Sequence, residues 1–147
     1  MRLEEIKTNK KRFLDLLLLA DEKEALIDLY LDRGTLYVLN DDGVKAVCVV
    51  TDEGNGVLEI QNLAVSPAFH RQGYGQKVIE LIEKNFQGKY KRLRVGTGDS
   101  PLTISFYEKC GFTEKERLKN FIIEHYDRPI FECGKQLIDK VVFEKNL

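Results

Sequence analysis

The sequence predicts an α/β (α+β) fold in a single domain. Three short apolar runs, at 35–39, 44–51 and from residue 58, are separated by Asn-Asp-Asp-Gly and Gly-Asn-Gly turns, a pattern typical of antiparallel hairpins. Apolar residues at helical spacing follow at 77–86 and again after residue 100. A chain of 147 residues is large enough for one core, so we expect one domain, 1–147.

The remaining elements follow in order along the chain. Residues 1–6 alternate weakly and predict an edge strand, and the apolar run 13–20 predicts a helix against the core. Asp21 with Glu24 resembles a capping box, which predicts a second helix through about residue 32. Later strands are expected at 92–95 and 136–143. Ser100 and Pro101 suit the start of a helix that Gly111 ends.

The central strand, which begins at Leu58, contains a break in its alternation. Leu58 and Ile60 occupy even positions, whereas Leu63 and Val65 occupy odd ones. Strand side chains alternate between faces, so the apolar residues stay on one face only if an extra residue is inserted. The pattern therefore predicts a β-bulge near Asn62-Leu63, with backbone groups left free for a ligand.

A glycine-rich turn and a helix follow this strand directly. Gly73 and Gly75 permit dihedral angles and close approaches that other residues do not. The first amides of a helix lack internal partners, and the helix dipole attracts anions there. The segment therefore predicts a phosphate-binding turn for a long ligand with a pyrophosphate, such as coenzyme A.

Other interpretations of the glycines fit less well. A dinucleotide-binding turn requires a third glycine where Val78 stands, and a Walker loop requires a Gly-Lys-Ser/Thr sequence that is absent here. An ordinary tight connection between strand and helix explains neither the break in alternation nor the motif that follows near residue 110.

The turn and one later segment resemble the GNAT superfamily of N-acetyltransferases. Its acyl-CoA signature is Gln/Arg-x-x-Gly-x-Gly/Ala, and here residues 70–75 are His-Arg-Gln-Gly-Tyr-Gly, so that His70 replaces the usual Gln or Arg. Residues 106–112, Phe-Tyr-Glu-Lys-Cys-Gly-Phe, also match the family. The resemblance extends from about residue 14 to the end of the chain.

The resemblance implies a GNAT-like mixed, largely antiparallel central sheet flanked by helices, with a splayed central strand pair that admits the thioester. It implies acetyl-CoA or coenzyme A as co-substrate, with no metal. The cofactor-binding residues that we expect are Leu63, Ala64, Val65, His70, Arg71, Gln72, Gly73, Tyr74, Gly75, Gln76 and Tyr107.

Acyl transfer to an amine requires a polarised carbonyl, an acid and a base. The amide of Leu63 or Val65 is the expected donor to the carbonyl oxygen. Tyr107 matches the position of the family's general acid, and a phenol is protonated at neutral pH; the alternative is an interior tyrosine that satisfies a backbone group. Glu59 is the expected base; the alternatives are a solvated strand position or a buried, hydrogen-bonded carboxylate.

Other reactive side chains are alternative candidates for these roles. Asp99, His125 and Glu132 remain candidate bases. A covalent route through Cys110 or Cys133 is disfavoured, because neither has an identifiable partner histidine. The segment 120–134 is rich in aromatic and charged residues, which fits a loop that closes over the acceptor and fits equally well a packed excursion that covers the sheet edge.

Composition excludes several classes of partner. The formal net charge of −1 gives no electrostatic case for nucleic acid or an anionic membrane. The three cysteines are odd in number and widely spaced, which favours free thiols and a cytoplasmic location, and the two histidines do not suggest a metal site. No segment resembles a signal peptide or a membrane span.

The sequence therefore favours an N-acyltransferase that moves an acetyl group from acetyl-CoA to a primary amine by direct transfer in a ternary complex. The acceptor is expected to be a small-molecule or peptide amine. The alternative hypothesis is a non-catalytic acyl-CoA sensor, and a homodimer is compatible with both.

Overall fold

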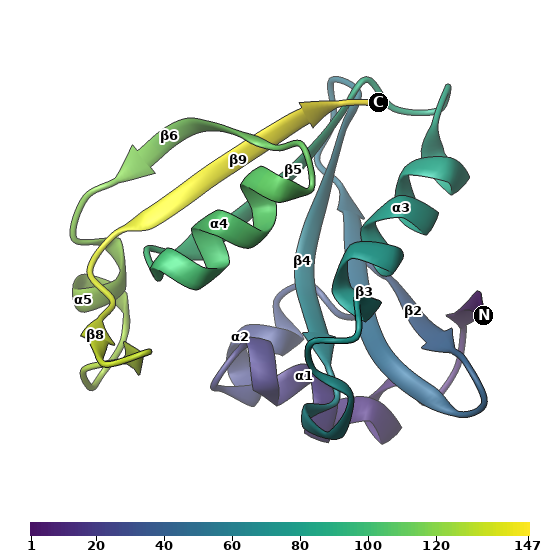
Figure 1. Ribbon diagram of the computed structural model, residues 1–147, viewed down its shortest axis with the longest axis horizontal. Coiled ribbons are helices and arrows are strands. Elements are labelled where there is room, and N and C mark those ends of the chain that lie inside the picture. Colours follow the sequence, from purple (N-terminus) through teal and green to yellow (C-terminus); the bar gives the residue numbers. More distant parts are fainter. The chain divides into compact units, whose positions relative to one another are not determined.

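The computed structural model describes all residues from Met1 to Leu147 as two compact units (Figure 1). The first unit is Met1–Lys91 together with Leu147, and the second is Arg92–Asn146. The longest helix, α3, has 13 residues, and no helix reaches the length and hydropathy that a membrane span requires.

The first unit is built on four antiparallel strands in the order β1-β2-β3-β4. Their bounds are β1 Arg2–Ile6, β2 Thr35–Asn40, β3 Val44–Asp52 and β4 Val57–Val65. The predicted edge strand and both predicted turns are present. Asp42 and Gly43 have positive φ in the first turn, and Gly54, Asn55 and Gly56 have positive φ in the second.

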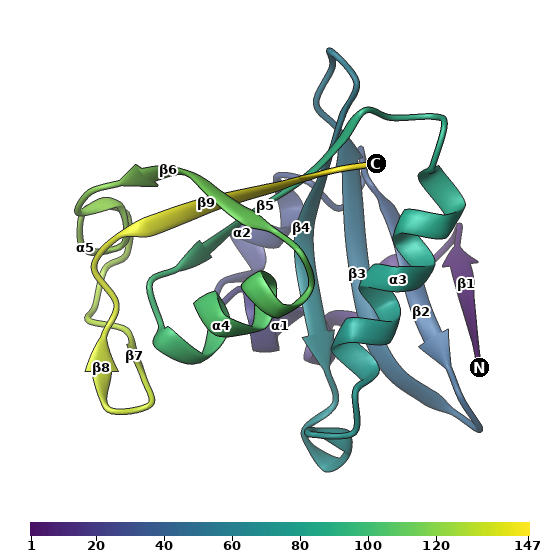
Figure 2. The ribbon, with the colours of Figure 1, turned by 45° about the horizontal axis from the view of Figure 1, so that its top comes forward.

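Helices cover both faces of these strands (Figures 1 and 2). On one face, α1 (Leu14–Ala20) and α2 (Glu24–Asp28) enclose a core that includes Leu17, Ile27, Val47 and Val49. On the other face lies α3 (Tyr74–Phe86), which buries Val78, Ile79 and Ile82. The 3-10 helices Lys10–Phe13 and Pro67–Phe69 precede α1 and α3.

Two helix boundaries differ from the prediction. Helix α2 spans five residues and begins after Lys23, with no side-chain cap, so the capping box predicted at Asp21 is wrong. The Asp21 carboxylate instead accepts a hydrogen bond from the Tyr30 hydroxyl at 3.1 Å. Helix α3 begins at Tyr74, three residues before the predicted start.

The second unit contains the strand order β5-β9-β6, also antiparallel. The bounds are β5 Arg92–Gly98, β6 Thr113–Leu118 and β9 Lys140–Asn146, with the short hairpin β7 Phe131–Glu132 and β8 Lys135–Gln136. Its helices are α4, Pro101–Lys109, and α5, Phe121–His125.

Helix α4 starts and stops where the sequence predicts, but two details differ. Ser100 is the N-cap residue, yet its hydroxyl makes no capping hydrogen bond. An amphipathic helix buries its large apolar side chains, but Leu102 is 64% exposed. The last long strand begins at Lys140 and not at Gln136, because Leu137–Asp139 form an irregular connection from β8.

Candidate acyl-CoA site

The predicted bulge is present in β4, one position earlier than expected. Asn62 pairs with Val49 and Ile60 pairs with Val50, so Gln61 is the extra residue. The registered partners of Ile60 and Leu63 are Val50 and Cys48, which share a face of β3 because they are two residues apart. The bulge therefore keeps the apolar residues of β4 on one face, as the break in alternation predicts.

The end of β4 presents amides that take no part in its ladder with β3. The Ser66 amide donates to the Lys45 carbonyl at 2.9 Å, so it points toward β3. Backbone groups alternate along a strand, so the Ala64 amide also points toward β3, whereas the amides of Leu63 and Val65 point away from it. Of the three residues predicted to bind the cofactor on β4, Leu63 and Val65 therefore have amides that face away from β3, whereas the amide of Ala64 faces β3.

The turn between β4 and α3 adopts a left-handed backbone at two positions. Arg71 has φ 63° and Gly73 has φ 81°. A Cβ at Gly73 would meet no atom within 4 Å, so the backbone angle and not crowding favours glycine. An alternation of right- and left-handed residues directs successive amides into one concavity, which suits an anion.

The start of α3 continues this run of unpaired amides. Gly73 is the N-cap residue and no side chain caps the helix. The Lys77 amide makes the first helical bond, to the Gly73 carbonyl at 3.0 Å, which leaves the amides of Tyr74, Gly75 and Gln76 without internal partners. With the helix dipole, this arrangement fits a pyrophosphate, so the residues present are compatible with coenzyme A.

His70 lies beside the turn, and its side chain contacts the end of β4. Its Nε2 is 2.9 Å from the Val65 carbonyl oxygen, which can only accept, so Nε2 carries the proton. Because the Val65 carbonyl points away from β3, this contact satisfies a group outside that ladder. The side chain that replaces the family's usual Gln or Arg therefore fixes the end of β4.

The turn is braced against the β2–β3 hairpin by contacts that sequence reasoning missed. The Tyr74 hydroxyl donates to Asp41 at 2.9 Å, and this hydrogen bond raises the pKa of Tyr74. The Lys45 ammonium lies 4.1 Å from the centre of the Phe69 ring. These partners are distant in sequence, so no local sequence pattern predicts the contacts.

Glu59 lies half-buried on β4, within a chain of polar side chains. The Gln61 amide nitrogen donates to Glu59 at 2.7 Å and to the Thr51 hydroxyl at 3.1 Å, and Thr51 donates to Glu53 at 2.7 Å. Glu59 is therefore held in place by the hydrogen bond from Gln61. Thr51 and Glu53 were not predicted.

Tyr107 lies on α4 in the second unit and is 7% exposed. Its ring contacts Phe112 at 5.5 Å and Phe143 at 5.8 Å between centroids. Aromatic packing thus fixes the ring, which is compatible with an acid and with an interior tyrosine.

Among the other candidate bases, the Asp99 carboxylate contacts both a backbone amide and an ammonium group. Burial alone raises its pKa, but hydrogen bonds from the Ile138 amide and the Lys135 ammonium outweigh burial and hold the pKa below its ordinary value. An acid that ionises so readily is a weak base. His125 stacks on Phe121 at 4.0 Å within α5, and Glu132 is exposed on the β7–β8 hairpin.

The cysteines and metal-ligating groups form no second centre. Burial raises the pKa of the Cys48 thiol to about 12, so it stays protonated at neutral pH. Cys133 is exposed. No group of three or more His, Cys, Asp or Glu side chains is placed to hold a metal ion.

Known proteins resemble this chain in sequence and in structure. The family model of the acetyltransferase (GNAT) domain matches residues 32–114. The uncharacterized N-acetyltransferase YvbK of Bacillus subtilis (strain 168) is 38% identical over 130 residues, which cover 86% of this chain and 84% of that protein.

Two solved structures match nearly the whole chain. A Bacillus subtilis acetyltransferase in complex with CoA has a TM-score of 0.90 and 34% identity, covering 99% of this chain and 98% of its own. A GNAT family acetyltransferase from Elizabethkingia anophelis with acetyl-CoA bound has a TM-score of 0.92 and 32% identity, covering 99% and 97%.

The fold defines a class, the acetyltransferases with a mixed and largely antiparallel sheet flanked by helices, as the sequence predicts. The chain belongs to the GNAT family within that class. The predicted enzyme class, an acetyl-CoA-dependent N-acetyltransferase, is confirmed by this membership.

Proposed function

We propose that the chain transfers an acetyl group from acetyl-CoA to the primary amine of a small molecule or a peptide, by direct transfer in a ternary complex. The observation that carries this proposal is the run of unpaired amides from Arg71 to Gln76 at the start of α3. The GNAT relatives with bound CoA and acetyl-CoA support it. When bound, acetyl-CoA supplies a thioester that is activated for attack by an amine.

The first role of the chain is to hold the cofactor through its backbone. The amides of Arg71, Gln72, Gly73, Tyr74, Gly75 and Gln76 would hold the pyrophosphate. The backbone groups of Leu63 and Val65, which point away from β3 on either side of Ala64, would hold the adjoining arm. His70 contributes indirectly, because it fixes the Val65 carbonyl.

The second role is to polarise the carbonyl that is attacked. An amide of β4 that points away from β3 would donate to the developing oxyanion, which favours Leu63 or Val65 over Ala64. A backbone donor held in a strand costs little reorganisation during the reaction.

The third role is proton transfer. We assign the base to Glu59, which Gln61 orients, and which would take the proton from the ammonium form of the acceptor directly or through water. We assign the acid to Tyr107, whose phenol would protonate the leaving thiolate. The acceptor, a cytoplasmic location and a homodimer remain parts of the proposal.

A calorimetric titration followed by a thiol-release screen tests the proposal. The purified chain is titrated with acetyl-CoA and with CoA, and free thiol is then measured against a panel of primary amines. Acetyl-CoA binding with release for one class of amine is the expected result.

Binding without release for any amine would contradict the enzyme and favour an acyl-CoA sensor. Absence of binding would contradict the assignment of the turn itself.

A further inference from the structure

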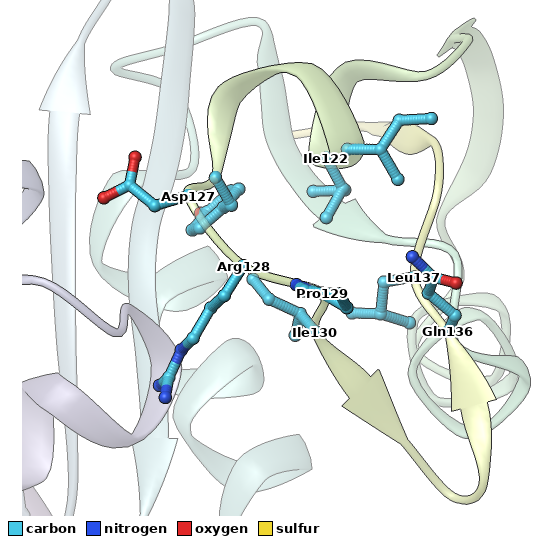
Figure 3. Close-up of a pocket in the computed structure, with 9 residues that line it drawn as sticks. Ile122, Asp127, Arg128, Pro129, Ile130, Gln136 and Leu137 are labelled. Atoms are coloured by element: carbon cyan, nitrogen blue, oxygen red, sulfur yellow. The ribbon is translucent and has the colours of Figure 1, made fainter.

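A pocket of about 140 Å³ lies in the second unit, beside α5 and the start of the connection after β8 (Figure 3). Its lining combines apolar side chains such as Ile122 and Leu137 with the charged Asp127 and Arg128. This mixed lining defines no single class of ligand. The first unit holds a more ordered arrangement, a row of polar side chains on β3 and β4 that ends at Glu59.

The polar row consists of Arg33, Glu53, Thr51, Gln61 and Glu59, in this order. Thr51 and Glu59 are opposite each other in the ladder between β3 and β4, so their side chains lie on the same face of the sheet. Arg33 Nη1 donates to Glu53 Oε2 at 2.9 Å, and the Thr51 hydroxyl donates to the same oxygen at 2.7 Å. Gln61 connects Thr51 to Glu59 through hydrogen bonds of 3.1 Å and 2.7 Å.

The carboxylate of Glu53 fixes the direction of the hydrogen bonds in the polar row. A carboxylate can only accept, so the single hydroxyl proton of Thr51 must point to Glu53. The Thr51 oxygen is then an acceptor for Gln61, which must offer its NH2 group and not its carbonyl oxygen. The same NH2 group donates its second proton to Glu59.

The burial of Thr51 makes this order costly to break. Thr51 is 2% exposed, so its hydroxyl depends on partners within the protein. If the Gln61 amide were reversed, its carbonyl oxygen would face the Thr51 oxygen and the Glu59 carboxylate, and no proton would lie between these acceptors. The polar row therefore holds Gln61 in one orientation, and Gln61 in turn holds Glu59.

We propose that Thr51 and Glu53 are positioning residues for the base. They orient the Gln61 amide so that it holds the Glu59 carboxylate where that carboxylate takes the proton from the acceptor amine. This inference rests on the proposed function, because it presupposes Glu59 as the base. Arg33 is half exposed, and an exposed ion pair contributes little, so its contribution to the order of the row is small.

The first test separates the hydroxyl of Thr51 from its methyl group. Thr51→Val keeps the shape and removes the hydroxyl, whereas Thr51→Ser keeps the hydroxyl and removes the methyl. Loss of the buried hydrogen bonds is expected to lower kcat/KM for the amine about tenfold in Thr51→Val. Thr51→Ser is expected to stay close to wild type, and the Kd of acetyl-CoA is expected to be the same in both variants.

A role in packing alone predicts the opposite order. Thr51→Ser would then be the weaker enzyme, because it leaves a cavity where the methyl group was and Thr51→Val does not. That order would overturn the inference. The matched control is Thr113→Val, which removes a threonine hydroxyl that donates to the Glu144 carbonyl at 3.4 Å on the exposed strand β6, and it is expected to have the activity of wild type.

A double-mutant cycle tests whether Thr51 acts through Glu59. In a Glu59→Gln background the base is already absent, so Thr51→Val is expected to cause no further loss of kcat/KM. A full additional loss in the double variant would assign Thr51 an independent role and overturn the inference.

A spectroscopic measurement separates this inference from the proposed function. Exchange of the Gln61 NH2 protons with water is followed by nuclear magnetic resonance without acetyl-CoA or amine. It is expected to be faster in Thr51→Val than in wild type and in Thr51→Ser. Faster exchange together with full activity of Glu59→Gln would support the orientation of Gln61 by Thr51 and contradict Glu59 as the base. Unchanged exchange in Thr51→Val would overturn the inference even if Glu59→Gln is inactive.

Discussion

Tyr107 is the residue on which the proposed chemistry depends most. It is 7% exposed and packed against Phe112 and Phe143, so replacement by phenylalanine keeps the shape and removes only the hydroxyl. Tyr107→Phe is therefore expected to lower kcat about 100-fold, the usual contribution of a positioned acid, with little change in the Kd of acetyl-CoA. Thiol release at saturating substrates and calorimetry measure both, and an unchanged kcat would assign Tyr107 to packing alone.

Glu59 offers a complementary test at the same scale. Glu59→Gln removes the carboxylate but retains the size of the side chain, so kcat/KM for the amine is expected to fall about 100-fold while acetyl-CoA still binds. The comparison variant is Gln61→Leu, which keeps the carboxylate and removes the hydrogen bond of 2.7 Å that orients it, and a smaller loss is expected. Equal activity of wild type and Glu59→Gln would transfer the role of base to another group.

Cys48 predicts the response of stability to alkaline pH. Burial raises its pKa from 9.0 to about 12, so between these values the unfolded thiol ionises while the folded thiol does not. The contribution of this thiol to the free energy of unfolding is therefore fully present below pH 9. Above pH 9 the free energy of unfolding falls by about 1.4 kcal/mol for each pH unit. Urea unfolding of wild type and Cys48→Ala at pH 8 and pH 10.5 measures the effect, and parallel pH dependences would contradict it.

At the scale of elements, the turn into α3 is the proposed binding site of the cofactor. Gly75→Glu places a carboxylate among the unpaired amides of the first turn, where it would compete with a phosphate. We expect calorimetry to detect no acetyl-CoA binding by this variant. The matched control is Asn85→Glu, which adds the same charge at an exposed position in the last turn of the same helix. Equal affinities of the two variants would contradict the assignment of the turn.

The elements also show how far sequence alone reaches. The change of alternation in β4 predicts a bulge, because strand side chains alternate between only two faces. The extra residue cannot be identified from the sequence, because Gln61 and Asn62 are both polar and either could be inserted without moving an apolar side chain. The sequence predicts the start of α3 three residues late, because Tyr74, Gly75 and Gln76 show no apolar periodicity and include a glycine.

Long-range contacts account for most of what sequence could not predict. The hydrogen bond between Tyr74 and Asp41 joins residues 33 positions apart, and a side chain at Gly98 would collide with Leu137. Such pairs are set by tertiary packing, whereas turns and periodicity are local signals. The motif at residues 70–75 was therefore recognisable, but the residues that brace it were not.

At the scale of the whole molecule, cofactor binding is expected to stabilise the fold. A ligand that binds only the native state adds about 2.7 kcal/mol to the free energy of unfolding at 100 times its Kd. Urea unfolding with and without acetyl-CoA at that ratio measures this gain, and the Gly75→Glu variant is expected to show none. A gain in that variant would indicate that acetyl-CoA binds elsewhere.

That residues 1–147 act as one domain, with a splayed central strand pair, stays a prediction.

The proposed binding of phosphate by backbone amides has an evolutionary consequence. Mutation exchanges side chains but leaves an amide at every position except proline. The side chains of Gln72 and Gln76 can therefore change without loss of phosphate binding, provided that the left-handed backbone at Arg71 and Gly73 is kept. Substitutions can thus alter the surface around the proposed cofactor site, and with it the acceptor, while the backbone that would bind the phosphates stays the same.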